Sequence, residues 1–470
     1  MLMKHNIKRM QVLKISFLNR EKEIGRLSKV IDSNGPAFVV VYGRRRIGKS
    51  TLLQKIIRDK DIYYCADQRN SSLQIVSLAE EISRIIPGFA DAEYPSWKAL
   101  LSSVNSRVPH KVTLVLDEFP YLVQLSPELP SILQKLIDDK SKMTIVICGS
   151  SQRMMQGLIL DSSAPLYGRA EEIIKLHPLD IGWIQRALEV SSIKSIEAYS
   201  IWGGIPRYWE LVKKYNNQEQ ALKDLVFDRN GVLHEEPSRL LSDDMKSLVQ
   251  ANSLLLLIAN GCHKISEIAA RIQIPSTSLT RPLSNLIDLG YIKRELPFGE
   301  NIKSTKRSLY KINDQFLLFW YKFVQQNKSL LERNLIDEVY REFERGFPLH
   351  ISEVWEDLAR ESTARLNIGG ISWKPAQRWW GHGKDGKAME IDVVAESFDR
   401  KMLLFGEAKW EEKSNIKTLF EKLDYCIDNF PQLNNRKILR AAWLKRDQKD
   451  FMNRNRQTII IPDDILKAMK

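Results

Sequence analysis

The sequence predicts an α/β fold built on a parallel β-sheet, because three short apolar segments have the composition of buried strands. The segments are AFVVVY at 37–42, VTLVL at 112–116 and TIVIC at 144–148. Continuous apolar runs rich in β-branched residues suit parallel strands that are covered on both faces. The residues that follow each segment indicate what the sheet binds.

A glycine-rich loop, GRRRIGKS at 43–50, follows the first segment and leads into the helical pattern TLLQKII. The order strand, GxxxxGK(S/T), helix is the context of a phosphate-binding P-loop. Gly43 and Gly48 permit a tight turn whose N–H groups face the phosphates, and the helix N-terminus adds partial positive charge. We expect Lys49 to reach the β- and γ-phosphates of ATP and Ser50 to place its hydroxyl on Mg²⁺. The residues expected to bind the nucleotide are Gly43, Arg44, Arg45, Arg46, Ile47, Gly48, Lys49, Ser50 and Thr51.

Two carboxylates end the second segment. Asp117 stands at the strand end, where it is placed to hold Mg²⁺, usually through water. Glu118 follows it, where a general base could orient the attacking water. Together with the P-loop, this pair predicts hydrolysis of ATP to ADP and phosphate, with Lys49 and Glu118 as catalytic residues.

Three further polar residues each have a functional and a structural interpretation. Ser150 or Ser151, after the third segment, is placed either to sense the γ-phosphate or to cap the next helix. Arg169, in the motif PLYGR, is an arginine-finger candidate that would stabilise transition-state charge. The alternative for Arg169 is a structural ion pair. The sequence leaves both pairs of alternatives open.

The motifs occur in a characteristic order: NREKEIGRL at 19–27, GRRRIGKST, VLDEF, CGSS, PLYGR and GGIPRYW at 203–209. This set resembles the archaeal-type ATPase family, a branch of the AAA+/STAND P-loop ATPases. The resemblance implies a P-loop NTPase sheet over residues 1–177 and a helical lid over 178–245. It also implies that Arg20 and Glu21 lie near the adenine, and that Pro206 and Arg207 lie near the nucleotide.

Residues 246–330 have the pattern of a winged helix, with three helical segments and then two strands around a loop. The functional interpretation is DNA binding, with phosphate contacts from the hairpin and base contacts from the start of the third helix. The alternative is a packing or protein-interaction module. The basic hairpin residues are Lys293, Arg294, Lys303, Lys306, Arg307 and Lys311, and the helix residues are Thr277, Ser278, Thr280 and Arg281.

Residues 331–470 carry three carboxylates and a lysine in a pattern that suits metal-dependent phosphodiester cleavage. Glu356 lies on a predicted helix at 350–366, Asp392 on the strand MEIDVVA, and Glu407 and Lys409 on the strand MLLFGEAKW. A short turn can pair the two strands as a hairpin, and strand alternation puts Glu407 and Lys409 on one face. We therefore expect the three carboxylates to bind one Mg²⁺.

The spacing E, D, ExK resembles the PD-(D/E)XK nuclease fold, to which the C-terminal domain of unknown function in this ATPase family is similar. The resemblance implies an α/β restriction-endonuclease-like domain. The proline of the name is absent, since Ile391 precedes Asp392. Two alternatives stay open: a working nuclease, or a degenerate core kept for binding DNA or protein.

The composition is that of a soluble globular protein with several domains, at 470 residues, 43% hydrophobic and 27% charged. The net charge of +13 favours a polyanionic partner, duplex DNA first, although a basic protein without such a partner is the alternative. The four cysteines have neither metal nor redox spacing, so we expect no zinc, no disulfide and a cytoplasmic location. We expect no signal peptide and no membrane span, and a homo-oligomer or partner proteins stay open.

The predicted function is that of an ATPase, with ATP and Mg²⁺ as cofactors, whose nucleotide state controls a DNA-directed C-terminal half. That half would bind DNA and, with an active nuclease-like site, cut it as a Mg²⁺-dependent endonuclease. The alternative is a nucleotide-dependent switch or scaffold that binds proteins and has an inactive nuclease-like domain.

Overall fold

The computed structural model describes residues 17–139, 141–245, 247–301, 305, 307–433, 435–447 and 457–470. The chain divides into two compact units. The N-terminal unit is Asn19–Pro178 with Ser238–Leu248, and the C-terminal unit contains Leu179–Pro237 and Val249–Lys470. Within the described ranges, every helix is too short or too polar to cross a bilayer.

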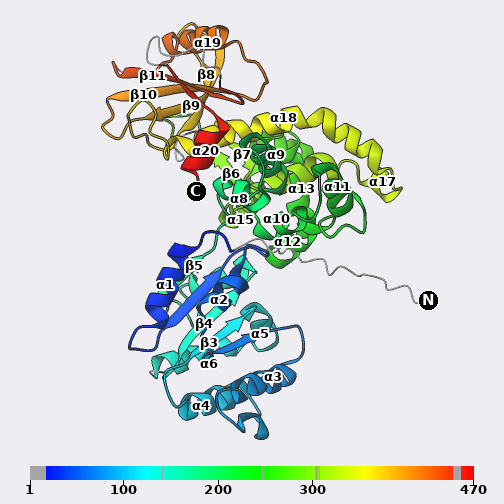
Figure 1. The fold of residues 1–470 in the computed structure, drawn as a ribbon, viewed down its shortest axis with the longest axis vertical. Helices are drawn as coiled ribbons and strands as arrows, with labels where there is room; N and C mark the ends of the chain where they lie inside the picture. The colour runs from blue at the N-terminus through cyan, green and yellow to red at the C-terminus, as the bar shows by residue number, and fades with distance from the viewer. Residues whose placement is uncertain are drawn as a thin grey trace, which may run out of the picture. The chain divides into compact units, whose positions relative to one another are not determined.

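The N-terminal unit is built on a five-stranded sheet in the order β2-β3-β4-β1-β5, all parallel (Figure 1). Its strands are β1 (Phe38–Tyr42), β2 (Ile62–Cys65), β3 (Thr113–Asp117), β4 (Thr144–Gly149) and β5 (Glu172–Lys175). The three apolar segments of the sequence are β1, β3 and β4, and every residue of these three strands is buried. The predicted parallel sheet is therefore confirmed.

Helices cover this sheet and share its apolar core with the strands. They are α1 (Glu21–Ile31), α2 (Lys49–Ile56), α3 (Ser71–Ser83), α4 (Trp97–Arg107), α5 (Phe119–Leu125), α6 (Leu129–Asp138) and α7 (Gln152–Ile159), with a 3-10 turn η1 (Phe89–Asp91). The side chains of Asn70 and Ser96 cap α3 and α4 by accepting from backbone N–H groups. Leu78, Leu100 and Leu133 are fully buried in the core, and each such leucine contributes about 2 kcal/mol.

The first part of the C-terminal unit is helical and contains one β-hairpin. Its helices are α8 (Ile184–Leu188), α9 (Ser192–Trp202), α10 (Pro206–Val212), α11 (Gln218–Leu222), α13 (Leu248–Ala259), α14 (Ile265–Ile272), α15 (Ser276–Asp288), α16 (Gln315–Phe319) and α17 (Lys328–Glu332). A 3-10 helix is η2 (Ile181–Trp183), and two π-helical segments are η3 (Lys223–Phe227) and η4 (Trp320–Val324). The hairpin is β6 (Ile292–Glu295) with β7 (Leu309–Ile312). Three helices, α13 to α15, and then a hairpin lie where the sequence predicts them.

Helix α12 (Glu236–Asp244) crosses the boundary between the two units. The segment predicted as one lid over 178–245 is therefore divided, with 179–237 in the C-terminal unit and 238–248 in the N-terminal unit. The reason is that the last residues of α12 make their contacts with the end of β4 and with the glycine-rich loop.

The last part of the chain forms a mixed five-stranded sheet in the order β12-β11-β10-β9-β8. Its elements are β8 (Gln377–His382), β9 (Ala388–Glu396), β10 (Met402–Lys409), β11 (Lys437–Leu444) and β12 (Gln457–Ile460), with helices α18 (Ile336–Thr363), α19 (Ile416–Asp428) and α20 (Pro462–Ala468). Strands β9 and β10 pair as the predicted antiparallel hairpin, whereas β10, β11 and β12 are parallel. Helix α18 begins fourteen residues before the predicted 350, because Pro348 is accommodated inside it.

Candidate functional site

The glycine-rich loop needs both of its glycines for steric reasons. Gly43 has φ +153°, and a Cβ there would lie 2.5 Å from the carbonyl oxygen of Leu176 and 2.7 Å from Ile47 Cδ1. Gly48 has φ +92°, a left-handed conformation that other residues rarely adopt, and it directly precedes α2. The loop therefore turns tightly enough to present backbone N–H groups at the start of a helix.

Lys49 and Ser50 are the first two residues of α2. Lys49 is buried, and its Nζ donates to the carbonyl oxygens of Gly43 at 3.0 Å and Arg44 at 3.1 Å. These bonds keep the ammonium inside the curve of the loop. Arg20 connects the loop to the segment after β5, because its guanidinium donates to the carbonyl oxygens of Ile47 at 3.4 Å and His177 at 2.6 Å.

Asp117 ends β3 and is fully buried. Its Oδ2 accepts a hydrogen bond of 2.6 Å from the Tyr63 hydroxyl, and its Oδ1 accepts from the backbone N–H of Glu118 at 2.9 Å. Burial, and then the Asp117 carboxylate, raise the pKa of Tyr63, whose hydroxyl also lies near Ser50. Tyr63 thus fixes the carboxylate next to the helix that carries Ser50.

Glu118 has a left-handed backbone with φ +52°. Such a conformation costs a non-glycine residue about 1–3 kcal/mol, and it is found preferentially at functional sites. The carboxylate is held in place, because Glu118 Oε2 accepts from the Ser150 hydroxyl at 2.8 Å and from the Ser150 backbone N–H at 3.2 Å. Ser150 therefore positions Glu118, while the neighbouring Ser151 is the N-cap of α7 through Met154.

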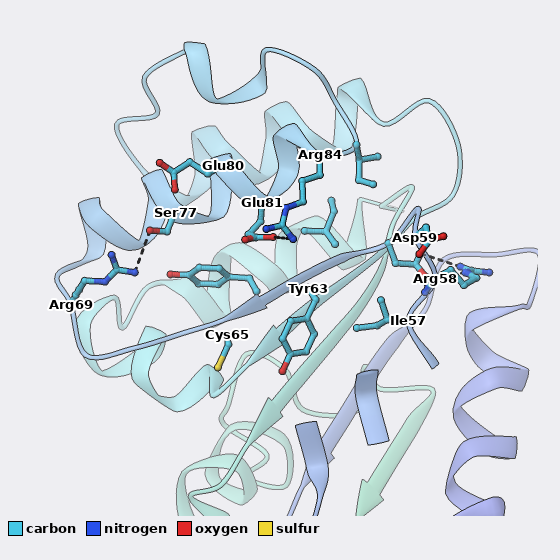
Figure 2. A pocket seen from close by; sticks show the side chains of 14 residues that line it. Ile57, Arg58, Asp59, Tyr63, Cys65, Arg69, Ser77, Glu80, Glu81 and Arg84 are labelled. Atoms are coloured by element: carbon cyan, nitrogen blue, oxygen red, sulfur yellow. Dashed lines mark hydrogen bonds and ion pairs between the residues drawn. The ribbon is translucent and has the colours of Figure 1, made fainter. Parts of the chain in front are cut away.

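A pocket of about 670 Å³ runs beside β2, the edge strand of the sheet, and α3 forms its opposite wall (Figure 2). Tyr63 and Cys65 lie on the strand side, and Ser77, Glu81 and Arg84 lie on the helix side. Burial, and then the Asp117 charge, raise the pKa of Cys65 to about 11, so its thiol stays protonated at neutral pH. Tyr63 is shared by this pocket and the Asp117 site.

In the C-terminal unit, Asp392, Glu407 and Lys409 come together on β9 and β10. The pairing of Val393 with Gly406 puts Asp392 and Glu407 opposite each other on one face. Lys409 Nζ lies 3.5 Å from Glu407 Oε2 and 3.9 Å from Asp392 Oδ2. Burial, and then the Asp392 charge, raise the pKa of Glu407 to about 7.

Glu356 lies on α18, in the helix that the sequence predicts. It lines a pocket of about 240 Å³ with His263, Lys311 and Arg378. Burial, and then Asp392, raise the pKa of Glu356 to about 7. Among the described residues, no three Asp, Glu, His or Cys side chains are gathered closely enough to hold a metal ion. The predicted convergence of three carboxylates on one ion is therefore not found among the described residues, although Asp392 is close enough to Glu356 to affect its carboxyl group electrostatically.

The hairpin β6–β7 is held against α18 by a cluster of ion pairs. Lys293 Nζ lies 2.9 Å from Asp357 Oδ2, and Lys311 Nζ lies 3.5 Å from Glu295 Oε2. Arg360 pairs with the same Asp357 and also donates to the carbonyl oxygen of Asp392 at 3.0 Å. Burial acts to raise the pKa of Asp357, but the Lys293 and Arg360 charges outweigh it and hold that pKa well below its usual range.

The connection between β6 and β7 is also anchored. The backbone N–H of Phe298 donates to the carbonyl oxygen of Arg378 on β8 at 2.9 Å, and the Phe298 ring packs beside Phe430. Carboxylates of the same unit pair with the ammonium groups of Lys293 and Lys311, and contact of these two lysines with DNA phosphates stays a prediction. Lys303 and Lys306 lie outside the described residues. The two other basic residues, Arg294 and Arg307, bond to Ser308 and Glu300 respectively.

Comparison with known proteins agrees with this geometry. Residues 17–212 match the family described as an ATPase domain predominantly from Archaea, and residues 320–419 match a family of archaeal and bacterial proteins of unknown function. The Walker-type ATPase of Pyrococcus abyssi has a similar fold, with a TM-score of 0.51 and 21% identity over 65% of this chain and 96% of that one. The chain contains a P-loop ATPase domain.

Two proteins of Methanocaldococcus jannaschii resemble the chain in sequence. One, an uncharacterised protein, is 29% identical over 421 residues, which is 87% of this chain and 91% of that protein. The other, an uncharacterised ATP-binding protein, is 35% identical over 48 residues, 10% of this chain and 81% of that protein. The first similarity extends far beyond the P-loop ATPase domain.

Arg169 of the P-loop ATPase domain forms a bidentate ion pair. Its Nε and Nη2 lie 2.8 and 2.9 Å from the two carboxylate oxygens of Asp138, and its Nη1 donates to the carbonyl oxygens of Pro165 and Tyr167. This arrangement is the structural alternative of the sequence analysis. An arginine-finger role for Arg169 stays a prediction.

Sequence reasoning missed two residues near the predicted nucleotide site. Tyr63 lies on β2, which is the spatial neighbour of β3, and a tyrosine at a strand end carries no signal by itself. Asp243 reaches the glycine-rich loop from α12, at a separation along the chain that no local pattern reveals. Both depend on contacts between elements that are far apart in sequence.

Proposed function

We propose that the P-loop ATPase domain hydrolyses Mg²⁺-bound ATP to ADP and phosphate. The observation that carries the proposal is the fixed orientation of Glu118, whose strained backbone and hydrogen bonds to Ser150 hold its carboxylate beside the end of β3. Two buried residues support it: Asp117, the carboxylate expected to bind the metal, ends β3, and Lys49 begins α2.

Each residue has a defined task in this reaction. Lys49 would leave its carbonyl partners to bind the β- and γ-phosphates, and the N–H groups of 43–50 would surround them. The Ser50 hydroxyl and Asp117 carboxylate are hard oxygen donors that suit Mg²⁺, with the Tyr63 hydroxyl fixing the carboxylate. Bound Mg²⁺ would neutralise charge on the phosphates. Glu118 would orient and deprotonate the attacking water.

The test is phosphate release by the purified chain with ATP and Mg²⁺. We expect turnover by the wild type, and we expect Lys49→Ala to lower nucleotide affinity at least about tenfold, because it removes the charge that binds the β- and γ-phosphates. Lys55→Ala, on the same helix, is the matched control and should behave as wild type. A wild type that releases no phosphate, or a Lys49→Ala variant with unchanged affinity, would contradict the proposal.

A second proposal concerns metal-dependent DNA cleavage in the C-terminal unit. Its support is the placement of Asp392, Glu407 and Lys409 on one face of β9 and β10. Glu407 Oε1 is buried and has no hydrogen-bond partner among the described residues. Such an oxygen could serve as a ligand for a bound cation. Asp392 and Glu407 would hold the metal, and Lys409 would hold the attacking water.

DNA binding would in this case rely on α15 and not on the hairpin. Thr277, Ser278, Thr280 and Arg281 are all exposed at the start of α15, whereas the hairpin is anchored. The net charge of +13 favours the approach of a polyanion. The alternative is a nucleotide-dependent switch that binds partner proteins, or other copies of itself, and has an inactive carboxylate site.

Incubation with duplex DNA and Mg²⁺ or Mn²⁺ separates these alternatives. Cleavage by the wild type that Asp392→Ala abolishes, with ATP turnover unchanged, is the expected result for a nuclease, because the metal loses a ligand. Gel retardation of the same samples reports binding. Retardation without cleavage would show that the C-terminal unit binds DNA but is not a nuclease. Absence of both retardation and cleavage would favour the protein-binding switch.

A further inference from the structure

The segment Ser238–Leu248 lies outside the matched ATPase family but contacts the predicted nucleotide site. The family match ends at residue 212, yet Ser238–Leu248 belongs to the N-terminal unit. This segment contains the end of α12, and it ends at the first residue of α13. The chain therefore continues directly from this segment into the other unit.

The segment contacts two parts of the site at once. Asp243 Oδ2 lies 3.2 Å from Nη1 of Arg45 in the glycine-rich loop. The Ser151 hydroxyl, at the end of β4, donates to the backbone carbonyl oxygen of Asp243 at 2.8 Å. The backbone N–H of Arg153 lies 3.4 Å from Asp244 Oδ1. The acidic end of α12 thus bridges the loop and the strand end.

The carboxylate of Asp243 lies near residues that are expected to act on the terminal phosphate group of ATP. Lys49 and Glu118, the lysine expected on the γ-phosphate and the proposed base, are both close enough to affect the Asp243 carboxyl electrostatically. Burial is the main cause of its raised pKa, and Arg45 acts in the opposite direction. Oδ2 is buried and makes no hydrogen bond of good geometry within the described residues, so Arg45 holds it by charge alone.

We infer that Asp243 is a specificity-determining residue that favours ADP over ATP, because its carboxylate holds the place beside Arg45 that the γ-phosphate needs. The inference rests on the proposed ATP site. ADP ends at the β-phosphate and leaves the Arg45–Asp243 pair intact. ATP brings a further anionic group, which must displace the carboxylate and then takes Arg45 as its own partner.

Displacement of Asp243 has a structural consequence. The γ-phosphate and the carboxylate are both anions, so they repel each other within the same small volume. When the carboxylate leaves Arg45, the hydrogen bond from Ser151 to the Asp243 carbonyl is also under strain. The segment Ser238–Leu248 would then change its position with ATP but not with ADP, which links nucleotide state to α13.

The experiment compares affinities for ADP and for a non-hydrolysable ATP analogue by titration calorimetry with the full chain and Mg²⁺. We expect Asp243→Asn to bind the analogue about tenfold more tightly, the change of one removed like-charge contact, and ADP within about twofold of wild type. Asp243→Glu, which keeps the charge, should retain the wild-type preference. Ser242→Ala, whose side chain is exposed and bonds only to the Arg239 carbonyl, is the matched control.

Each other outcome has a definite meaning. Equal gains for ADP and the analogue would show a general charge effect and overturn the inference, and so would no gain for either. Asp243→Ser, a smaller uncharged variant, gives the same comparison if Asp243→Asn does not fold. A wild type that binds neither nucleotide would overturn the proposed function itself, whereas tight binding of both with no effect at Asp243 would overturn only the inference.

Discussion

Replacing Glu118 with glutamine is expected to lower ATP turnover at least about 100-fold and to leave nucleotide affinity nearly unchanged. Loss of a general base typically costs two to four orders of magnitude, whereas the phosphates and the metal are bound by other residues. Glutamine has the same shape and can still accept a hydrogen bond from Ser150. The measurements are steady-state phosphate release and an ADP and ATP titration on the same preparation.

Ser150→Ala is the variant to compare with it. It removes the hydroxyl that positions Glu118 but keeps the base and the backbone N–H donor, so a smaller decrease, about tenfold, is expected. If Glu118→Gln hydrolyses ATP at close to the wild-type rate, Glu118 is not the base. If only Ser150→Ala is impaired, the essential group is the serine.

The Asp357→Ala variant is expected to destabilise the C-terminal unit by about 3–5 kcal/mol, because it leaves Lys293 and Arg360 without their shared carboxylate. Arg360 is buried, so water cannot replace the lost partner easily. Urea unfolding followed by tryptophan fluorescence measures the change. The anchoring of the hairpin β6–β7 to α18 should be weakened in the same variant, which faster proteolysis of the hairpin would report.

An exposed ion pair in the same hairpin provides the control. Arg307→Ala removes the pair with Glu300, and a loss of no more than about 1 kcal/mol is expected for such a surface contact. Adding Lys293→Met to Asp357→Ala should restore part of the stability, since one of the two unpaired charges is removed. Equal stability of Asp357→Ala and wild type would show that the cluster does not hold the hairpin.

The ion pairs of the hairpin β6–β7 show that the net positive charge of the chain does not by itself identify a surface that binds DNA. A count of lysines and arginines cannot distinguish a surface that attracts DNA from charges that are neutralised inside the fold. Lys293 and Lys311 belong to the second class, because α18 and β6 bring carboxylates to them. The start of α15, by contrast, is exposed, and so are the basic residues Lys264 and Arg271 of the same region.

The sequence by itself determined the core of the nucleotide site. Strand, glycine-rich loop and helix are adjacent along the chain, so the roles expected of Gly43, Lys49 and Ser50 follow from local order. The pairing of β9 with β10 was equally predictable, because a short turn joins two apolar strands. Local signals are sufficient where the interacting groups are near neighbours in sequence.

Only the tertiary structure decided which distant groups meet. It brought Tyr63 to Asp117 across two parallel strands, Ser150 to Glu118, and Asp243 to Arg45. It also placed Glu356 in a pocket with Lys311 and Arg378, and in the described residues no three carboxylates gather closely enough for one metal ion. Such contacts depend on the order of the strands in a sheet and on how each helix is oriented when its apolar face packs. Sequence periodicity predicts which face of a helix is apolar, but it does not predict which elements that face contacts.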